Sequence, residues 1–532
     1  MPNTKKLLSI TNLKKYFPIA KSNIFQKEQL YVRANEDITL DIFEGETLGI
    51  VGESGCGKST LGRVLLQLYE QTAGTTVYYG MPRSAIAPGY VLDTLKNVDK
   101  YVARLKKAKE HADAMTAKVE SAGENATFFD HQNKNLADAE YETALAHVAK
   151  ILGGFLVKDT KKGASLLYKK SQLEDSAAKI AEKIGDLKLE LDLAGEENHA
   201  KKAKLEASIA KLEAERAGEL AEIEKLDTAI ASEKKQYEYD PEFQKYEAML
   251  DDGIDLARLK YNEMRRLRKD LQIVFQDPYS SLNPRMTVGQ IIEEGLVAHK
   301  MYKHGSPAMK EHILSVMRAC GLQDYMLHRY PHQFSGGQRQ RISIARALAV
   351  GPKFVVCDEC VSALDVSIQS QIINLLQDLK EKQHLTYMFI SHDLSVVRYI
   401  SDRICVMYLG NIVELGDAAT IFDDPRHPYT VALLSSIPTT DIESLKKERI
   451  LLEGNIPSPI KPPDGCKFHT RCYMACDKCR RVPPPLTEVE PGHFVACHFP
   501  ERKIDAEGNY LFKLPDTEKK STRHDAVEAG AE

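Results

Sequence analysis

The sequence predicts an α/β fold with a long all-α insertion and a small cysteine-containing region near its C-terminus, and three observations lead to this prediction. A glycine-rich loop, Gly52–Thr60, stands between a short apolar strand and an apolar helix. Residues 81–252 are rich in Ala, Lys and Glu and have helical periodicity. Residues 452–464 are rich in proline and lead into a group of cysteines.

The glycine-rich loop fits the phosphate-binding pattern G-x-x-x-x-G-K-[ST]. Its residues are Gly52, Glu53, Ser54, Gly55, Cys56, Gly57, Lys58, Ser59 and Thr60. Glycines allow the backbone N–H groups to point inward, and the N-terminus of the following helix adds its dipole, so the loop can hold phosphate oxygens. We expect Lys58 to reach the β- and γ-phosphates of ATP and Ser59 to bind Mg²⁺.

Composition excludes several classes of protein. The 532 residues suffice for a nucleotide-binding domain with additions, and a net charge of -4 does not indicate a nucleic-acid binder. No apolar run reaches membrane-spanning length, and the N-terminus lacks a signal-peptide pattern. We therefore expect a cytosolic protein whose ten cysteines do not form a disulfide framework.

The segment ahead of the loop, residues 7–51, alternates apolar and polar residues and predicts strands. Tyr16 lies in this segment, where an aromatic face could stack on adenine. A half-buried strand aromatic is the alternative, and the sequence leaves both open.

Residues 81–252 predict amphipathic helices that pair with one another. One apolar stripe comprises Leu205, Ile209, Leu212, Ile223, Leu226 and Ile230, and an earlier segment places Leu92, Leu95, Val102 and Leu105 on one face. Breaks are expected at 123–125 and at Gly153-Gly154. The pattern favours an antiparallel helical hairpin or small coiled coil, either a solvated arm or a docking arm for a partner.

Strand and helix character returns at residue 253, where the basic run 263–270 is interpreted as a solvated helix face. Five further motifs follow in order. They are Gln276 after a strand; Ser335, Gly336, Gly337 and Gln338 at the start of a helix; Asp358 and Glu359 at the end of an apolar strand; Ser362, Ala363, Leu364 and Asp365; and His392 after another strand.

These residue types suit phosphate chemistry. A carboxylate at the end of a parallel strand, Asp358, can hold Mg²⁺ opposite the phosphate loop, and Glu359 can polarise the attacking water. Gln276 can reach the metal or the water, and His392 can hydrogen-bond the γ-phosphate. A histidine in a purely structural role is the alternative for His392. Ser335, Gly336 and Gly337 at a helix N-terminus offer a second anion site.

In this order the motifs resemble those of ABC-type ATPases. They correspond to the phosphate loop (Walker A), the Q-loop, the signature, the Walker B carboxylates, the D-loop and the switch histidine of that family. The resemblance covers residues 7–80 and 253–498. It implies a dimer in which the signature of one subunit caps the ATP of the other, and in which ATP closes the dimer and hydrolysis reopens it. Cys360 stands where this family usually has a proline, and Cys357 precedes Asp358; buried, inert thiols are the favoured interpretation of both.

Within that family, residues 277–288, 361–367 and 426–430 resemble the oligopeptide/dipeptide importer branch, and more its second, F-type ATPase subunit than its first. The resemblance implies a D-type ATPase as heterodimer partner, two membrane permeases, an extracytoplasmic peptide-binding protein and a peripheral position on the cytoplasmic face of the membrane. A permease coupling helix would enter beside Gln276 and the helices of residues 286–330. The transported compound is not touched by ATPase subunits, so peptides follow from the resemblance alone.

The cysteines Cys466, Cys472, Cys479 and Cys497, with Cys476 as an extra, resemble the tail of peptide-importer ATPases, which in some members binds an iron–sulfur cluster. A cluster, structural Zn²⁺ and free thiols all remain open. The predicted divisions are 1–80 and 253–435 for the ATPase domain, 81–252 for the insertion, 436–498 for the cysteine-containing region and 499–532 for a charged, disordered tail.

Other ATPases of this type act on DNA or on ribosomes, and the helical arm could then contact such a partner. In DNA-repair members the coiled coil follows the Q-loop, whereas here it precedes Gln276. Ribosomal members usually carry two cassettes, whereas this chain has one.

Overall fold

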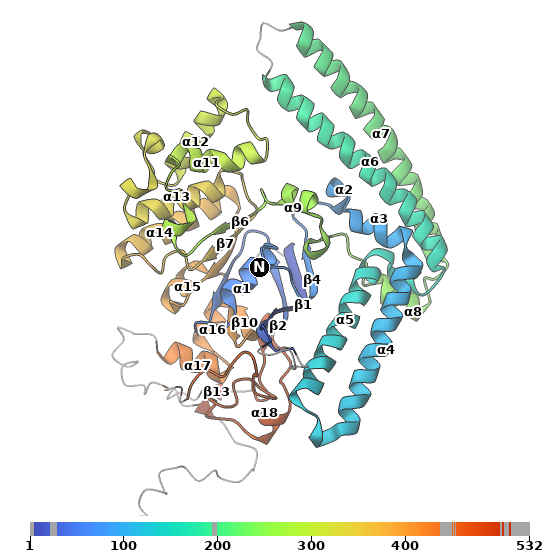
Figure 1. Cartoon of the computed structure of the whole chain (residues 1–532), viewed down its shortest axis with the longest axis vertical. Coiled ribbons are helices and arrows are strands. Elements are labelled where there is room, and N and C mark those ends of the chain that lie inside the picture. The colour runs from blue at the N-terminus through green and yellow to red at the C-terminus, as the bar shows by residue number, and fades with distance from the viewer. Residues whose placement is uncertain are drawn as a thin grey trace, which may run out of the picture.

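The computed structural model describes residues 5–21, 29–193, 199–436, 450, 452, 454–500, 503–504 and 510–511. Figure 1 shows a body of sheets and helices beside which two helical hairpins lie, the longer one reaching away from the body. The fold is therefore the expected α/β domain with a helical insertion.

The larger sheet of the described chain has the order β11-β12-β10-β9-β3-β8-β7-β6, in which β9, β3, β8, β7 and β6 run parallel to one another. Every residue of β3, β7 and β8 is buried, which is typical of parallel strands covered on both faces. The strands are β3 (Thr47–Val51), β6 (Leu271–Val274), β7 (Phe354–Asp358), β8 (Thr386–Ile390), β9 (Arg403–Tyr408), β10 (Asn411–Asp417), β11 (Thr487–Glu490) and β12 (His493–Val495).

A smaller antiparallel sheet, in the order β2-β1-β4-β5, packs its apolar face against α1 (Lys58–Leu65) and one side of the larger sheet. Its strands are β1 (Lys6–Pro18), β2 (Tyr31–Phe43), β4 (Ala73–Tyr78) and β5 (Ile254–Asp255). Strands β4 and β5 are hydrogen-bonded neighbours, with Tyr78 opposite Ile254. The whole insertion thus takes the place of the loop that joins the two antiparallel strands β4 and β5.

The insertion, residues 81–252, is helical, as predicted. Its helices are α2 (Arg83–Ile86), α3 (Gly89–Lys96), α4 (Val98–Ala122), α5 (Phe128–Leu152), α6 (Thr160–Leu193), α7 (His199–Lys235) and α8 (Pro241–Glu247). The α4–α5 and α6–α7 pairs form antiparallel hairpins (Figure 1). The expected breaks are confirmed as 3-10 turns at Gly123–Asn125 and Gly153–Leu156.

One detail of the insertion prediction is wrong. Leu92, Leu95, Val102 and Leu105 do not lie on one helix, because α3 ends at Lys96 and α4 begins at Val98. The Asn97 side chain donates hydrogen bonds to the backbone oxygen and the carboxylate of Asp93, which ends α3. In the other stripe, Leu205, Ile209 and Ile230 are buried in the contact between helices, as expected.

A helical layer covers the other face of the larger sheet and encloses the main apolar core. It includes α10 (Pro278–Ser281), α11 (Val288–Ala298), α12 (Pro307–Ala319), α13 (Gly336–Leu348), α14 (Val366–Gln383), α15 (Leu394–Ile400), α16 (Ala418–Asp423) and α17 (Pro428–Ser435), while the basic run forms α9 (Tyr261–Leu267). None of the helices in the described ranges has the length and apolar character needed to cross a membrane.

The cysteine-containing region joins the body through β12, which pairs with β10. His493 on β12 and Glu414 on β10 form a buried contact that stabilises this pairing. The distance from Nε2 of His493 to Oε1 of Glu414 is 2.8 Å. The region also contains α18 (Asp477–Arg481). The predicted tail, 499–532, lies almost wholly outside the described residues, apart from residues 499–500, β13 (Lys503–Ile504) and β14 (Tyr510–Leu511).

Candidate functional site

The site lies at the carboxyl edge of the parallel strands, where α/β sheets bind ligands. The phosphate loop follows β3, Asp358 is the last residue of β7 and Glu359 comes directly after it, His392 follows β8 and Gln276 follows β6. Since these four strands are adjacent in the sheet, residues far apart in the sequence meet at one place.

The phosphate loop has the backbone that its glycines predict. Gly57 has a φ of 102°, and a Cβ there would lie 2.0 Å from the carbonyl oxygen of Ala34, so only glycine fits. The buried Lys58 donates from Nζ to the carbonyl oxygens of Gly52 at 2.7 Å and of Glu53 at 3.0 Å. Its ammonium group therefore lies inside the loop, where the phosphates of a nucleotide would bind.

Two of the predicted magnesium ligands, Ser59 and Asp358, are in contact with each other, whereas the third, Gln276, contacts Glu359. Ser59 donates from Oγ to Oδ1 of Asp358 at 2.5 Å, and the Asp358 carboxylate is buried. Arg63 lies 3.4 Å from the other carboxylate oxygen. A hydroxyl and a carboxylate at this distance fit Mg²⁺, which binds few protein oxygens and completes its shell with phosphates and water.

Glu359, Gln276 and His392 form a second cluster next to Asp358. Gln276 donates from Nε2 to Oε2 of Glu359 at 2.8 Å, and His392 Nδ1 lies 3.6 Å from the same oxygen. Glu359 has a φ of 47°, a strained backbone for a non-glycine residue, which occurs most often at functional sites. The cluster thus presents a carboxylate between two polar side chains, as needed to orient a water molecule.

The signature and D-loop residues lie at the surface. Ser335 caps the N-terminus of α13 in a reciprocal capping box with Gln338, and Gly336 and Gly337 form its first turn. Ser362, Ala363, Leu364 and Asp365 connect Glu359 to α14, and the Ser362 hydroxyl donates to the Glu359 carbonyl oxygen at 2.9 Å. Both segments are accessible to another molecule, in keeping with the dimer that the family resemblance implies.

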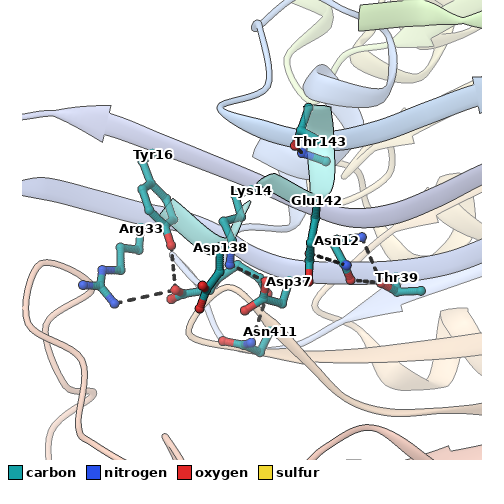
Figure 2. A network of polar contacts seen from close by, with 12 residues as sticks. Asn12, Lys14, Tyr16, Arg33, Asp37, Thr39, Asp138, Glu142, Thr143 and Asn411 are labelled. Carbon is teal, nitrogen blue, oxygen red and sulfur yellow. Dashed lines mark hydrogen bonds and ion pairs between the residues drawn. The ribbon is translucent and has the colours of Figure 1, made fainter. Parts of the chain in front are cut away.

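Tyr16 is not available for stacking on adenine in this structure, because its ring is 4% exposed. Its hydroxyl donates to Oε1 of Glu36 at 2.6 Å, and the Arg33 guanidinium lies 5.7 Å from its ring centre (Figure 2). The insertion holds Arg33 there, since Gln132 accepts a hydrogen bond from it and the Phe128 ring lies 5.0 Å from it. Of the two sequence interpretations, the structure favours the strand aromatic, although Tyr16 is fully buried and not half-buried as that interpretation expected.

Sequence reasoning missed the contribution of the C-terminal region. Arg471 donates two hydrogen bonds to the Glu53 carboxylate in the phosphate loop, at 2.7 and 3.0 Å. The Tyr429 hydroxyl accepts from the backbone N–H of Glu53 at 2.8 Å. Lys467 contacts Glu36; although burial opposes ionisation of that carboxyl, Lys467 and Arg33 lower the pKa of Glu36 to about 2. Tyr429 lies in the segment 426–430 that the sequence singled out, but no sequence signal marks Arg471 or Lys467, because basic side chains near cysteines suggest many roles.

The cysteines of this region gather around one pocket, lined by Cys466, Cys472, Cys479, Cys497 and Phe468 among others. Cys476 and Cys479 have sulfur atoms 3.7 Å apart. Burial raises the pKa of Cys466 to about 11. Nevertheless, in the ranges that the structure describes, no three His, Cys, Asp or Glu side chains are arranged to hold a metal ion. The thiols are brought together without forming a ligand set.

Three cysteines near the phosphate site are buried, which was favoured from the sequence for Cys357 and Cys360. Cys56, Cys357 and Cys360 are at most 4% exposed, and burial raises the pKa of Cys56. The hydrogen bond to Cys360, together with burial, raises the pKa of Cys357. The raised pKa makes the Cys56 and Cys357 thiols unreactive at neutral pH, because the thiolate is the reactive form.

Comparison with known proteins decides the family. Residues 35–215 and 239–362 match "ABC transporter", and residues 413–479 match "Oligopeptide/dipeptide transporter, C-terminal region". The chain belongs to the ABC transporter family. It is an ATPase of that family, and the matched residues include the phosphate loop and the carboxylates Asp358 and Glu359.

Two curated relatives illustrate the similarity. The oligopeptide transport ATP-binding protein AppF of Bacillus subtilis is 52% identical over 248 residues, which is 46% of this chain and 75% of AppF. The oligopeptide transport ATP-binding protein OppF of Haemophilus influenzae is 50% identical over 248 residues, 46% of this chain and 74% of OppF. A solved dimeric ATP-binding cassette with bound ADP and phosphate overlaps 77% of this chain and 99% of its own, with 17% identity and a TM-score of 0.40.

Proposed function

We propose that this chain is the ATP-hydrolysing subunit of a membrane importer for oligopeptides or dipeptides. The observation that carries the proposal is the match of residues 413–479 to the oligopeptide/dipeptide transporter C-terminal region, on a chain whose ATPase residues are all present. Relatives at 50–52% identity are named as oligopeptide transport proteins, which supports the same function. An ATPase that acts on DNA or ribosomes is not favoured by these relatives.

The roles of the site residues follow from their chemistry. Gly52–Thr60 hold the ATP phosphates, with Lys58 on the β- and γ-phosphates and with Ser59, Asp358 and Gln276 around Mg²⁺. Glu359 polarises the attacking water, while Gln276 and His392 orient the water and the γ-phosphate. Ser335–Gln338 and Ser362–Asp365 complete the ATP site of a second ATPase subunit.

The partners are a D-type ATPase, two permeases and, indirectly, an extracytoplasmic peptide-binding protein, with the chain peripheral on the cytoplasmic face of the membrane. ATP binding closes the ATPase dimer, and hydrolysis and product release reopen it, which drives the permeases. Support comes from the surface position of the signature and D-loop residues. No nucleic acid is part of this proposal.

The cysteine pocket supports a smaller proposal, that Cys466, Cys472, Cys479 and Cys497 bind an iron–sulfur cluster or Zn²⁺. Their convergence on one pocket is the support, and small rotations of the side chains would be needed to form a ligand set. Anaerobic purification followed by metal analysis and visible absorption would test it. Metal-free protein with full ATP binding would contradict it.

Purification of the chain from detergent-solubilised membranes, followed by mass spectrometry, tests the main proposal. We expect a second ATPase and two polytopic permeases to co-purify, and cells that carry Lys58→Ala in place of the wild type to lose uptake of labelled peptides. Unchanged peptide uptake in those cells would contradict the proposal, as would co-purification with DNA or ribosomes instead of permeases. Uptake of nickel or sugars would retain the importer but replace its substrate.

A further inference from the structure

The segment Cys466–Cys472 of the C-terminal region lies against the phosphate loop, although more than 400 residues separate the two in the sequence. Its Arg471 side chain is 6% exposed and makes a two-pronged contact with the Glu53 carboxylate, which is 24% exposed. Paired hydrogen bonds between a guanidinium and a carboxylate fix both distance and direction. The contact is therefore a specific, largely buried ion pair and not a solvent-exposed pair on the surface.

A second set of contacts holds the same segment in place. The Phe468 ring is 1% exposed and lies 5.2 Å from the ring of Tyr408 and 5.3 Å from that of Tyr429. The Tyr429 hydroxyl accepts the backbone N–H of Glu53, so the aromatic cluster touches the loop directly. Glu53 is consequently held from its backbone and its side chain at once.

The charge of Glu53 makes this contact important for ligand binding. Glu53 is the second residue of a loop whose ligand is a polyanion, and its own backbone oxygen accepts a hydrogen bond from Lys58. An uncompensated carboxylate at this position would repel the triphosphate. The Arg471 guanidinium supplies the compensating charge from outside the phosphate loop.

We propose that Arg471 is a positioning residue of the ATP site, which acts by neutralising Glu53, so that the Cys466–Cys472 segment sets the affinity for ATP. This inference rests on the proposed ATPase activity of the chain and adds a residue from outside the ATPase motifs to its site. The C-terminal region then contributes to nucleotide binding, in addition to any role that its thiols have.

The test is a double-mutant cycle with the full chain and a fluorescent ATP analogue, trinitrophenyl-ATP. Arg471→Gln should weaken binding about tenfold by leaving Glu53 uncompensated, whereas Glu53→Gln alone should not weaken it. The double variant Glu53→Gln, Arg471→Gln should bind within about threefold of wild type, because the repulsive charge is gone. Arg480→Gln is the matched control, since Arg480 lies in the same region but is exposed, and its ion pair in the described part of the chain is with Asp477.

Two further readouts separate positioning from simple loss of structure. The ATPase KM of Arg471→Gln should rise about tenfold at unchanged kcat, and the binding defect should shrink as salt rises, because screening weakens the repulsion. If Arg471→Gln does not fold, Glu53→Gln provides the test from the other side. Weaker binding by Glu53→Gln would overturn the inference.

The remaining outcomes are equally decisive. Wild-type affinity in Arg471→Gln, or a double variant as weak as Arg471→Gln alone, would overturn the inference while leaving the ATP site intact. A wild-type chain that binds no trinitrophenyl-ATP at all would instead overturn the proposed ATP site, and the inference with it.

Discussion

The C-terminal region and the helical insertion are both additions to the ATPase domain, but they contact it at different places. The C-terminal region reaches the phosphate loop through Arg471 and Glu53. The insertion lies along the smaller sheet, where Glu142 accepts from Asn12 on β1 and Thr143 accepts from the backbone N–H of Gly74 on β4 (Figure 2). One addition touches the ligand site, and the other touches the strands beside it.

This difference reflects how each addition enters the fold. The insertion leaves and re-enters through neighbouring strands, Tyr78 opposite Ile254, and has an apolar core of its own around Phe155 and Phe243. A long connection between adjacent strands costs little extra loop entropy, so the sheet closes around it. The C-terminal region instead shares residues with the main core, since Phe468 belongs to it.

The largest effect should come from Glu359→Gln, and the effects of changes in the two regions can be compared with it. ATP hydrolysis should fall at least about 100-fold, because the carboxylate that polarises water is lost, while ATP binding is retained. Single-turnover hydrolysis with labelled ATP measures the first, and filter binding the second. A variant that hydrolyses ATP at the wild-type rate would show that Glu359 is not the base.

A matched pair of phenylalanines compares the two regions directly. Phe468 and Phe243 are each 1% exposed, one against the tyrosines of the ATPase domain and the other inside the insertion. Each Phe→Ala change should lower the free energy of unfolding of its own region by about 3–5 kcal/mol. Only Phe468→Ala should weaken binding of the ATP analogue, by about tenfold, whereas Phe243→Ala should stay within about twofold.

Thermal melts would verify the two losses of stability, and titration with the fluorescent analogue would measure both affinities. Equal affinities in the two variants would show that the two regions do not differ in their effect on ATP binding.

The smallest effects should come from pH, at the contact between the insertion and the sheet. His147 on α5 is half-buried and lies 3.7 Å from Asp255 on β5. Burial and the nearby Arg258 lower the pKa of His147 to about 3, whereas burial raises the pKa of Asp255 to about 6. A histidine with a lowered pKa contributes stability that is present above its unfolded value and lost as pH falls. A carboxyl with a raised pKa contributes stability that is present below its unfolded value and lost as pH rises.

As the pH falls from about 7.5 to about 5.5, the titration of His147 therefore lowers the free energy of unfolding by about 1 kcal/mol, and the titration of Asp255 raises it by about 1 kcal/mol. On acidification, Asp255→Asn should lose stability relative to wild type, because only the histidine effect remains, and His147→Gln should gain it. Urea unfolding at the two pH values measures both, and groups that titrate elsewhere cancel in the comparison with wild type. Identical pH profiles for all three proteins would contradict the assignment.

Most of the ATP site could be predicted from the sequence, because its residues follow strand ends at fixed places in known motifs. Asp358 and Ser59 meet as expected, since the order of parallel strands determines which strand ends are neighbours. The helical insertion was predictable from its period and its glycine breaks, whereas the end of α3 at Lys96 was not, because Asn97 stops the helix through a local side-chain contact.

The contacts of Arg471 and the burial of Tyr16 could not be predicted in this way. Both depend on regions that are distant in the sequence and come close only after folding, the C-terminal segment at the phosphate loop in one case and α5 at the smaller sheet in the other. Single charged residues such as Arg33 and Arg471 have no periodicity or spacing that would identify their partners.

The most direct test of the account is the ATP affinity and turnover of a chain in which residues 81–252 are replaced by a short hairpin turn. Because Tyr78 and Ile254 are already paired, a turn can join β4 to β5. The account predicts affinity no more than about threefold weaker than wild type, with hydrolysis retained, since the insertion lies outside the ATP site. A folded variant that no longer binds or hydrolyses ATP would show that the insertion is part of the site and would contradict the account.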